Sequence, residues 1–215
     1  MTRGNKRRHL VGLFNFALRN QYTRNNPAVP LPTPRVHLDK RPTIFTVPEV
    51  RGLMRAAVDR KPEMIPYFAL CLFAGLRPDS EAQHMNWADI DLDRGELYVS
   101  NSISKTGTER YVALQPNLIE WLLPFHQEEA KVFFSRWFFV KIREQSELCW
   151  AHDITRHSYG SYHLGAFRNA GDTAEQMGHL SSTSMLFRHY RRAVRQDDAE
   201  EYWKIRPELT SEVMN

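Results

Sequence analysis

The chain has 215 residues, of which 42% are hydrophobic and 12% aromatic, enough to bury one good core and a small second unit. Lys and Arg exceed Asp and Glu by 29 to 25, a mild basic excess that permits a nucleic-acid partner without proving one. No apolar run is long enough to cross a bilayer, and the start of the chain lacks the apolar region of a secretory signal. We therefore expect a cytoplasmic protein without a membrane partner.

The usage of cysteine and histidine predicts neither a disulfide framework nor a metal centre. The cysteines are Cys71 and Cys149, and we expect both to be buried free thiols. The 9 histidines include no pair in a convincing ligand motif. No metal and no other cofactor is therefore expected.

The start of the chain predicts a helix followed by a linker. Residues Lys6 to Gln21 are basic, and their apolar side chains recur at the spacing of an amphipathic helix. The segment Asn26 to Pro34 then reads NPAVPLPTP, with prolines at four positions. Proline disfavours helix, so this segment is predicted to be an extended linker.

Two helices are predicted where the main core begins. Thr46 and Glu49 have the spacing of a capping box, in which each residue satisfies the backbone amide of the other at a helix N-terminus. Residues Met64 to Ala74 are apolar nearly all round, which predicts a central helix ending at Gly75. A further helix is predicted from about Ser80 to Trp87.

A small sheet and further helices are predicted for the rest of the chain. Glu96 to Ser100 and Arg110 to Leu114 alternate in polarity, which predicts an antiparallel pair with Lys105 in the connection. The fold class is therefore mainly α with a small antiparallel β-sheet (α+β). The later helices are predicted at Leu118–Phe125, Val132–Ile142, Ile154–Phe167, Asp172–Met177, Ser184–Val194 and Asp197–Ile205.

Five short motifs occur in a fixed order along the chain. They contain Arg77 in GLRPDSE, Lys105 in KTGTERYVAL, Arg156 in DITRH, His179 in MGH and Tyr190 in FRHYRR. These side chains suit phosphate chemistry, because a guanidinium can donate to two phosphate oxygens and a phenol can attack phosphorus. In this order the motifs resemble those of the tyrosine recombinases, or phage integrase family, and the resemblance covers roughly Phe45 to Ile205.

The resemblance implies both a domain organisation and a fold. It implies the tyrosine recombinase catalytic-domain fold for residues 45–215. Residues 1–44 would be the last helix of a core-binding domain together with the proline-rich linker. The remainder of a core-binding domain is missing from the sequence, so we expect a chain truncated at its N-terminus or a family member reduced there.

The resemblance also implies an activity, namely a site-specific recombinase or integrase. Such an enzyme cleaves and rejoins double-stranded DNA through a covalent 3′-phosphotyrosyl intermediate, with Tyr190 as the nucleophile. Arg77, Arg156 and His179 would hold the phosphate oxygens, and Lys105 would protonate the leaving 5′-oxygen. The implied assembly is a homotetramer on paired DNA sites, with no small-molecule substrate.

The chain departs from the family pattern near the second arginine. Where the family often has a histidine three residues before Arg156, this chain has Asp153, and His152 lies one step further back. Either residue could accept the proton of the nucleophile. Between Arg77 and Glu81, and again after Gly178-His179, the chain is also one or two residues longer than the common pattern.

Other interpretations of the same residues remain open at this point. Arg77 could simply pair with Asp79 or Glu81 at a helix end. The chain could be a catalytically impaired DNA-binding relic of an integrase, or an enzyme like a type IB topoisomerase. The last helix, DAEEYWKI, has an apolar tip at Trp203 and Ile205 that we expect to dock on a neighbouring subunit.

Overall fold

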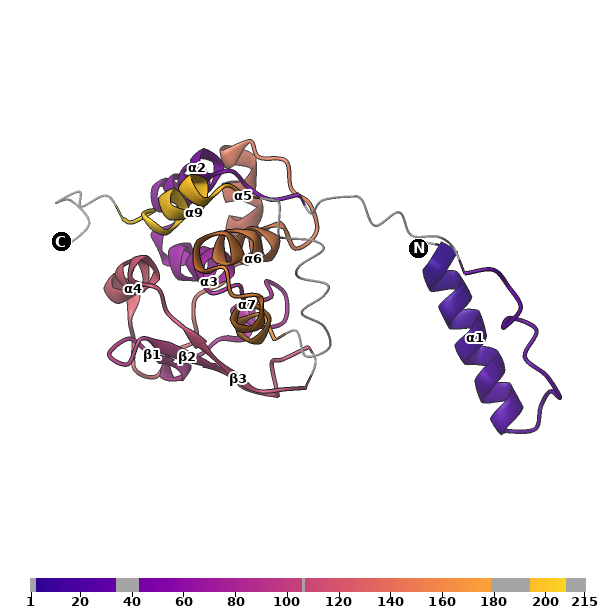
Figure 1. The fold of residues 1–215 in the computed structure, drawn as a ribbon. Helices are drawn as coiled ribbons and strands as arrows, with labels where there is room; N and C mark the ends of the chain where they lie inside the picture. Colours follow the sequence, from indigo (N-terminus) through magenta and orange to yellow (C-terminus); the bar gives the residue numbers. More distant parts are fainter. Residues whose placement is uncertain (1–2, 34–42, 106, 179–193, 208–215) are drawn as a thin grey trace. The chain divides into compact units, whose positions relative to one another are not determined.

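A computed structural model describes residues 3–33, 43–105, 107–178 and 194–207 of the chain (Figure 1). The chain divides into two compact units, Met1–Lys40 and Arg41–Asn215. In these described ranges, no helix combines the length and the apolar character that a membrane span requires.

The first unit is a helix with the following segment folded back on it. Helix α1 spans Arg3–Arg19, close to the predicted range. The prediction of an extended linker is wrong for residues 27–30, which form turns. The cause is hydrogen bonding by Asn26 and Arg7. The Asn26 side-chain oxygen accepts from the Ala28 amide at 2.9 Å, and the Arg7 guanidinium on α1 donates to the backbone oxygens of Leu31 at 2.9 Å and Val29 at 3.2 Å. Ala28 is buried there, whereas no residue of α1 is.

The second unit begins with the predicted capping box. Helix α2 spans Val47–Arg60. The Glu49 amide donates to the Thr46 hydroxyl at 3.4 Å, and the Thr46 amide donates to the Glu49 carboxylate at 2.6 Å. Helix α2 packs against α5, which spans Arg136–Ser146.

Helix α3 forms the centre of the second unit, as its apolar sequence predicts (Figure 1). It spans Ile65–Phe73 after the short turn η1, Pro62–Met64, and all of its residues are buried. It contacts α2, α4 at Pro116–Leu122 and α6 at Ile154–Phe167. A helix covered on all sides buries the most apolar area per residue, so packing holds α3 in place. The position of the turn that follows its C-terminal end and leads to Arg77 is fixed with it.

A three-stranded antiparallel sheet lies at one side of this core, in the order β1-β2-β3. Strands β2 and β3 span Glu96–Val99 and Arg110–Ala113 and correspond to the two predicted strands. The third strand, β1 at Ile90–Asp91, was not predicted because two residues are too few to show an alternating pattern. The predicted class, mainly α with a small antiparallel sheet, is confirmed.

The predicted helix from Ser80 to Trp87 is wrong. The predicted helix Val132–Ile142 is also wrong at its start. Residues 85–87 and 130–132 pair with each other instead, since the Val132 amide donates to the Met85 oxygen and the Trp87 amide to the Ala130 oxygen, both at 2.9 Å. Only the short turns η2, Ala82–His84, and η3, Trp87–Asp89, are helical here. Long-range backbone pairing has overridden the local helical pattern.

The remaining elements agree with the predicted ones to within a few residues. After α4 come the turn η4 at Leu123–Phe125, then α5, α6 and α7 at Ala170–Gln176, and finally α9 at Gln196–Trp203. The predicted helix Ser184–Val194 lies almost wholly outside the described residues. Of the two cysteines, Cys71 is buried as expected, but Cys149 is exposed.

The end of α9 packs into the chain's own core. Tyr202 and Ile205 are buried, and the Ile205 backbone oxygen accepts hydrogen bonds from Asn117 at 3.3 Å and Trp121 at 3.1 Å. The Tyr202 hydroxyl donates to the Leu72 oxygen at 2.6 Å. The expected docking of this apolar tip on another subunit is therefore wrong for Ile205, which is already covered.

Candidate functional site

The C-terminal end of α3 carries Arg77 out of the core through a turn that requires glycine. Gly75 has a φ of +64°, a region that residues with a side chain rarely adopt. A Cβ atom at this position would also lie 2.3 Å from the Tyr159 ring on α6. The α3 turn and α6 can therefore approach this closely only because residue 75 is glycine.

Glu81 binds Arg77 in two ways. One carboxylate oxygen accepts from the Arg77 guanidinium at 2.5 Å, and the other accepts from the Arg77 backbone amide at 2.9 Å. Of the two partners considered from sequence, Glu81 and not Asp79 is therefore the partner. The Glu81 side chain is fully buried, whereas that of Arg77 is 15% exposed. Glu81 thus binds the Arg77 guanidinium on its buried side, and part of the Arg77 side chain still reaches the surface.

Arg110, on β3, is the second arginine of this cluster. Its guanidinium donates to both oxygens of Glu81, at 3.1 and 2.8 Å, and its Nε donates to the Gln176 backbone oxygen at 2.8 Å. Gln176 in turn accepts from the Ala113 amide at 3.0 Å. Strand β3 is thereby tied to the C-terminal end of α7.

Arg156 lies in the first turn of α6 and is the third arginine. Its guanidinium donates to the backbone oxygens of Gly75 and Met177, and it lies 4.0 Å from the Glu81 carboxylate. Arg156 therefore links the turn after α3 to the turn after α7. Arginines that are distant in the sequence, at positions 77, 110 and 156, meet at one carboxylate, which makes this region strongly cationic.

The arginines keep the buried Glu81 carboxylate ionised. Burial alone would raise its pKa, but the hydrogen bonds and charge of Arg110, the Arg77 amide and the charge of Arg156 outweigh burial and lower the pKa. One negative charge against three positive charges leaves the cluster with an excess of donors and positive charge. Such a site suits an anion with several oxygens, such as a phosphate diester.

Lys105 lies in the segment that connects β2 to β3, and this segment leads directly to Arg110 of the arginine cluster. Lys105 is exposed, and the connection turns at Gly107, which has a φ of +68°. Arg110 begins β3 five residues after Lys105, so the hairpin has one end anchored at Glu81. Lys105 is therefore at the exposed part of the connection, and the end at Arg110 is fixed.

Asp153 and His152 occupy the turn that leads into α6. Asp153 has a φ of +55°, and its carboxylate lies 3.1 Å from the His152 ring. The His152 side chain is 87% exposed and that of Asp153 is 37% exposed. Both candidates for the proton acceptor therefore lie at the surface beside Arg156, and they contact each other.

Two of the predicted site residues, His179 and Tyr190, lie outside the described residues. The described range 107–178 ends directly before His179. Its last residue, Gly178, has a φ of +62° and approaches Arg110 closely. Among the described residues, no group of three or more His, Cys, Asp or Glu side chains could hold a metal ion.

Sequence reasoning missed Arg110, Gln176 and Gly178 as parts of this site. The signal for Arg110 was present, since the KTGTERYVAL motif contains it, but a strand arginine is ordinarily a surface residue. Here the Arg110 side chain is only 6% exposed. Its partner Glu81 lies 29 residues away, so only the fold reveals why the position needs a charge.

His163, on α6 behind the site, predicts a pH-dependent stability. Burial lowers its pKa to about 4, and its Nδ1 lies 2.8 Å from the Thr173 hydroxyl on α7. The unfolded histidine binds a proton near pH 6.5, so this contribution to stability is complete above that pH and is lost as pH falls toward 4. Between pH 7.5 and pH 5 the free energy of unfolding should fall by about 2 kcal/mol from this residue.

Urea denaturation at pH 7.5 and pH 5 measures this effect. His163→Asn keeps a donor for Thr173 but cannot titrate, so its stability should be lower at pH 7.5 and should fall less on acidification. Equal pH dependence of the variant and the natural protein would show that His163 is not the titrating group.

Comparison with protein-family models matches residues 44–196 to the phage integrase family. Among curated proteins, no sequence matches the chain. Among solved structures, the catalytic domain of bacteriophage HP1 integrase is similar with a TM-score of 0.58 at 16% identity, covering 70% of this chain and 88% of that one.

Two further solved structures share the fold. An integrase from mycobacterium phage Brujita has a TM-score of 0.58 at 19% identity, covering 97% of this chain and 74% of that one. A lambda integrase tetramer bound to a Holliday junction has a TM-score of 0.60 at 19% identity, covering 84% of this chain and 59% of that one.

Proposed function

The chain belongs to the phage integrase family, whose model matches residues 44–196, and on this premise we propose that it is a site-specific recombinase that cleaves and rejoins double-stranded DNA. The observation that carries the proposal is the convergence of Arg77, Arg110 and Arg156 on the buried Glu81 carboxylate. The convergence supports the proposal because three guanidinium groups around one carboxylate give the region a net positive charge, and Arg77 is the most exposed of the three. Preorganised donors of this kind stabilise the charge that grows on phosphate oxygens during displacement.

In the proposed cleavage step, the phenolic oxygen of Tyr190 attacks the phosphorus of one DNA strand. A bond forms between that oxygen and phosphorus, and the bond from phosphorus to the 5′-oxygen breaks. Arg77, Arg156 and His179 would hold the nonbridging oxygens. A phenol with a pKa of ~10 must lose its proton as it attacks, so Asp153 or His152 would accept that proton.

The leaving 5′-oxygen needs a proton, which Lys105 would donate. The exposed hairpin that carries Lys105 is suited to this role because its tip can close on the DNA while Arg110 anchors its base. The phosphotyrosyl ester keeps a reactive phosphate bond, so a second DNA 5′-hydroxyl can displace Tyr190 by the reverse reaction. Neither a nucleotide cofactor nor a metal enters these steps.

We also propose the partners that the family relationship suggests. The lambda integrase structure is a tetramer on a Holliday junction, and its shared fold supports a homotetramer on paired DNA sites for this chain. Residues 45–215 would be the catalytic domain. Residues 1–44 would be the last helix of a core-binding domain and its linker, and the Lys and Arg side chains of α1 suit contacts to DNA phosphates.

The test is a covalent trap. A pool of nicked duplexes with randomised sequence should yield a protein–DNA adduct that survives a denaturing gel, because the short cleaved fragment diffuses away and religation fails. Tyr190→Phe should abolish the adduct, since no other residue supplies the attacking oxygen. Mapping the adduct by peptide mass should place the DNA on Tyr190.

Tyr111→Phe is the matched control, because it removes a phenol that is 64% exposed on β3, and it should leave the adduct unchanged. An adduct that persists in Tyr190→Phe would refute this nucleophile, and its absence from the natural chain would favour a DNA-binding relic. Supercoil relaxation without exchange of strands between duplexes would favour an enzyme like a type IB topoisomerase.

A further inference from the structure

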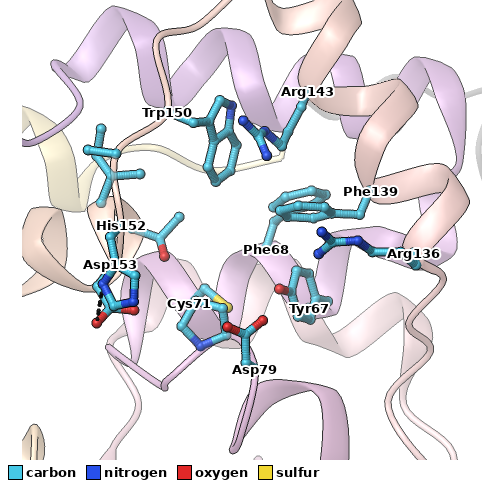
Figure 2. Close-up of a pocket in the computed structure, with 14 residues that line it drawn as sticks. Tyr67, Phe68, Cys71, Asp79, Arg136, Phe139, Arg143, Trp150, His152 and Asp153 are labelled. Carbon is cyan, nitrogen blue, oxygen red and sulfur yellow. Dashed lines mark ion pairs between the residues drawn. The ribbon is translucent and has the colours of Figure 1, made fainter. Parts of the chain in front are cut away.

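A cavity of about 300 Å³ lies between α3, α5 and the turn that leads into α6 (Figure 2). One part of its wall is the turn directly after Arg77, at Pro78 and Asp79. Another part is the turn directly before Arg156, from Ala151 to Thr155. The cavity therefore adjoins both segments that would hold the scissile phosphate, and this volume is at the low end of ligand pockets, about 300–1,000 Å³.

Much of the remaining wall is aromatic, and one guanidinium group packs over two of its rings. The aromatic lining residues are Tyr67, Phe68, Phe139 and Trp150. The Arg143 guanidinium lies 4.7 Å from the centre of the Trp150 ring and 5.6 Å from that of Phe139 (Figure 2). Ring faces and a guanidinium plane are the surfaces on which nucleic-acid bases stack.

The charges at the rim select a neutral occupant over a second phosphate. Asp79 and Asp153 lie on the rim together with Arg136, as Figure 2 shows. The two carboxylates balance the guanidinium groups of Arg136 and Arg143, so the lining lacks the net positive charge that a second phosphate would require. A nucleobase is neutral and flat, and its edge carries both donors and acceptors, so it can satisfy carboxylates and guanidinium groups at once.

We propose that this cavity receives one unstacked base of the DNA strand whose phosphate lies at Arg77 and Arg156. The proposal rests on the recombinase function proposed above and adds which part of the substrate leaves the duplex. Removing a base from the stack has a cost, and stacking in the aromatic cavity would offset it.

The test compares two fluorescein-labelled single strands by anisotropy. One is a thymidine tetranucleotide, and the other has the same backbone with tetrahydrofuran residues in place of every base. The natural chain should bind the first strand about tenfold more tightly, as one stacked base predicts. Ala151→Leu places bulk at the exposed rim without adding a ring, so it should remove most of this difference.

Ala88→Leu is the control, because Ala88 is exposed in η3 and does not line the cavity, and the difference should persist. Circular dichroism and the unfolding midpoint establish that each variant is folded.

The outcomes separate this proposal from the recombinase function. Equal binding of both strands by the natural chain, or a difference that survives in Ala151→Leu, overturns the base pocket even if the Tyr190 adduct forms. A preference for bases that Ala151→Leu abolishes supports the pocket, whether or not the adduct forms. Absence of the adduct would overturn the recombinase function alone.

Discussion

Replacing Arg156 by lysine is expected to slow DNA-strand cleavage by ~100-fold or more, although the positive charge is kept. The Arg156 guanidinium donates at once to the backbone oxygens of Gly75 and Met177. An ammonium group is a compact point charge and cannot span both carbonyls while also facing a phosphate. The turn that leads to Arg77 and the turn that precedes His179 would lose their common tether.

The single-turnover rate of adduct formation on the nicked duplexes measures this loss. Arg94→Lys is the matched control, because the Arg94 side chain is 76% exposed in the turn between β1 and β2 and its replacement should leave the rate unchanged. The assay belongs at a temperature where circular dichroism shows the lysine variant folded. A rate within about threefold of the natural protein would show that the planar fork of Arg156 is not needed.

Replacing Glu81 by alanine is expected to reduce the free energy of unfolding by about 3–5 kcal/mol. Glu81 is fully buried, and its loss leaves Arg110 and Arg156, with side chains only 6% and 5% exposed, without their shared counterion. The backbone amide of Arg77 loses its acceptor as well. Breaking a buried ion pair from one side is costly because the remaining charge stays buried without a partner.

Urea denaturation at neutral pH measures the effect of Glu81→Ala. A second substitution, Arg110→Met, removes one of the stranded charges and should recover part of the lost stability when combined with Glu81→Ala. Arg110→Met alone should be destabilising, since it leaves Glu81 with fewer donors. A loss below about 1 kcal/mol for Glu81→Ala would mean that the carboxylate does not hold the cluster together.

Helix boundaries set by local chemistry were predicted well from the sequence. The Thr46 and Glu49 capping box needs only residues three apart, and it forms as expected. The central helix α3 follows from an unbroken apolar run, and its end follows from Gly75. In both cases the interactions that decide the structure lie within one or two turns of chain.

Elements that depend on distant partners were predicted poorly. Residues 80–87 have a helical pattern, but backbone pairing of 85–87 with 130–132 prevents a helix. Likewise, Ile205 at the end of α9 looks like a docking residue until Asn117 and Trp121 are seen to bind its backbone oxygen. No local pattern identifies a partner more than eighty residues away.

The candidate site likewise has a part that the sequence predicts and a part that only the fold reveals. The amino-acid sequence by itself determined the family, because the order Arg77, Lys105, Arg156, His179 and Tyr190 in short motifs is a property of the linear chain. Only the tertiary structure decided that Glu81 joins the arginines and that Arg110 belongs with them. The physical reason is that a buried carboxylate is stable only where opposite charges from several elements converge, and that convergence exists only once the chain has folded.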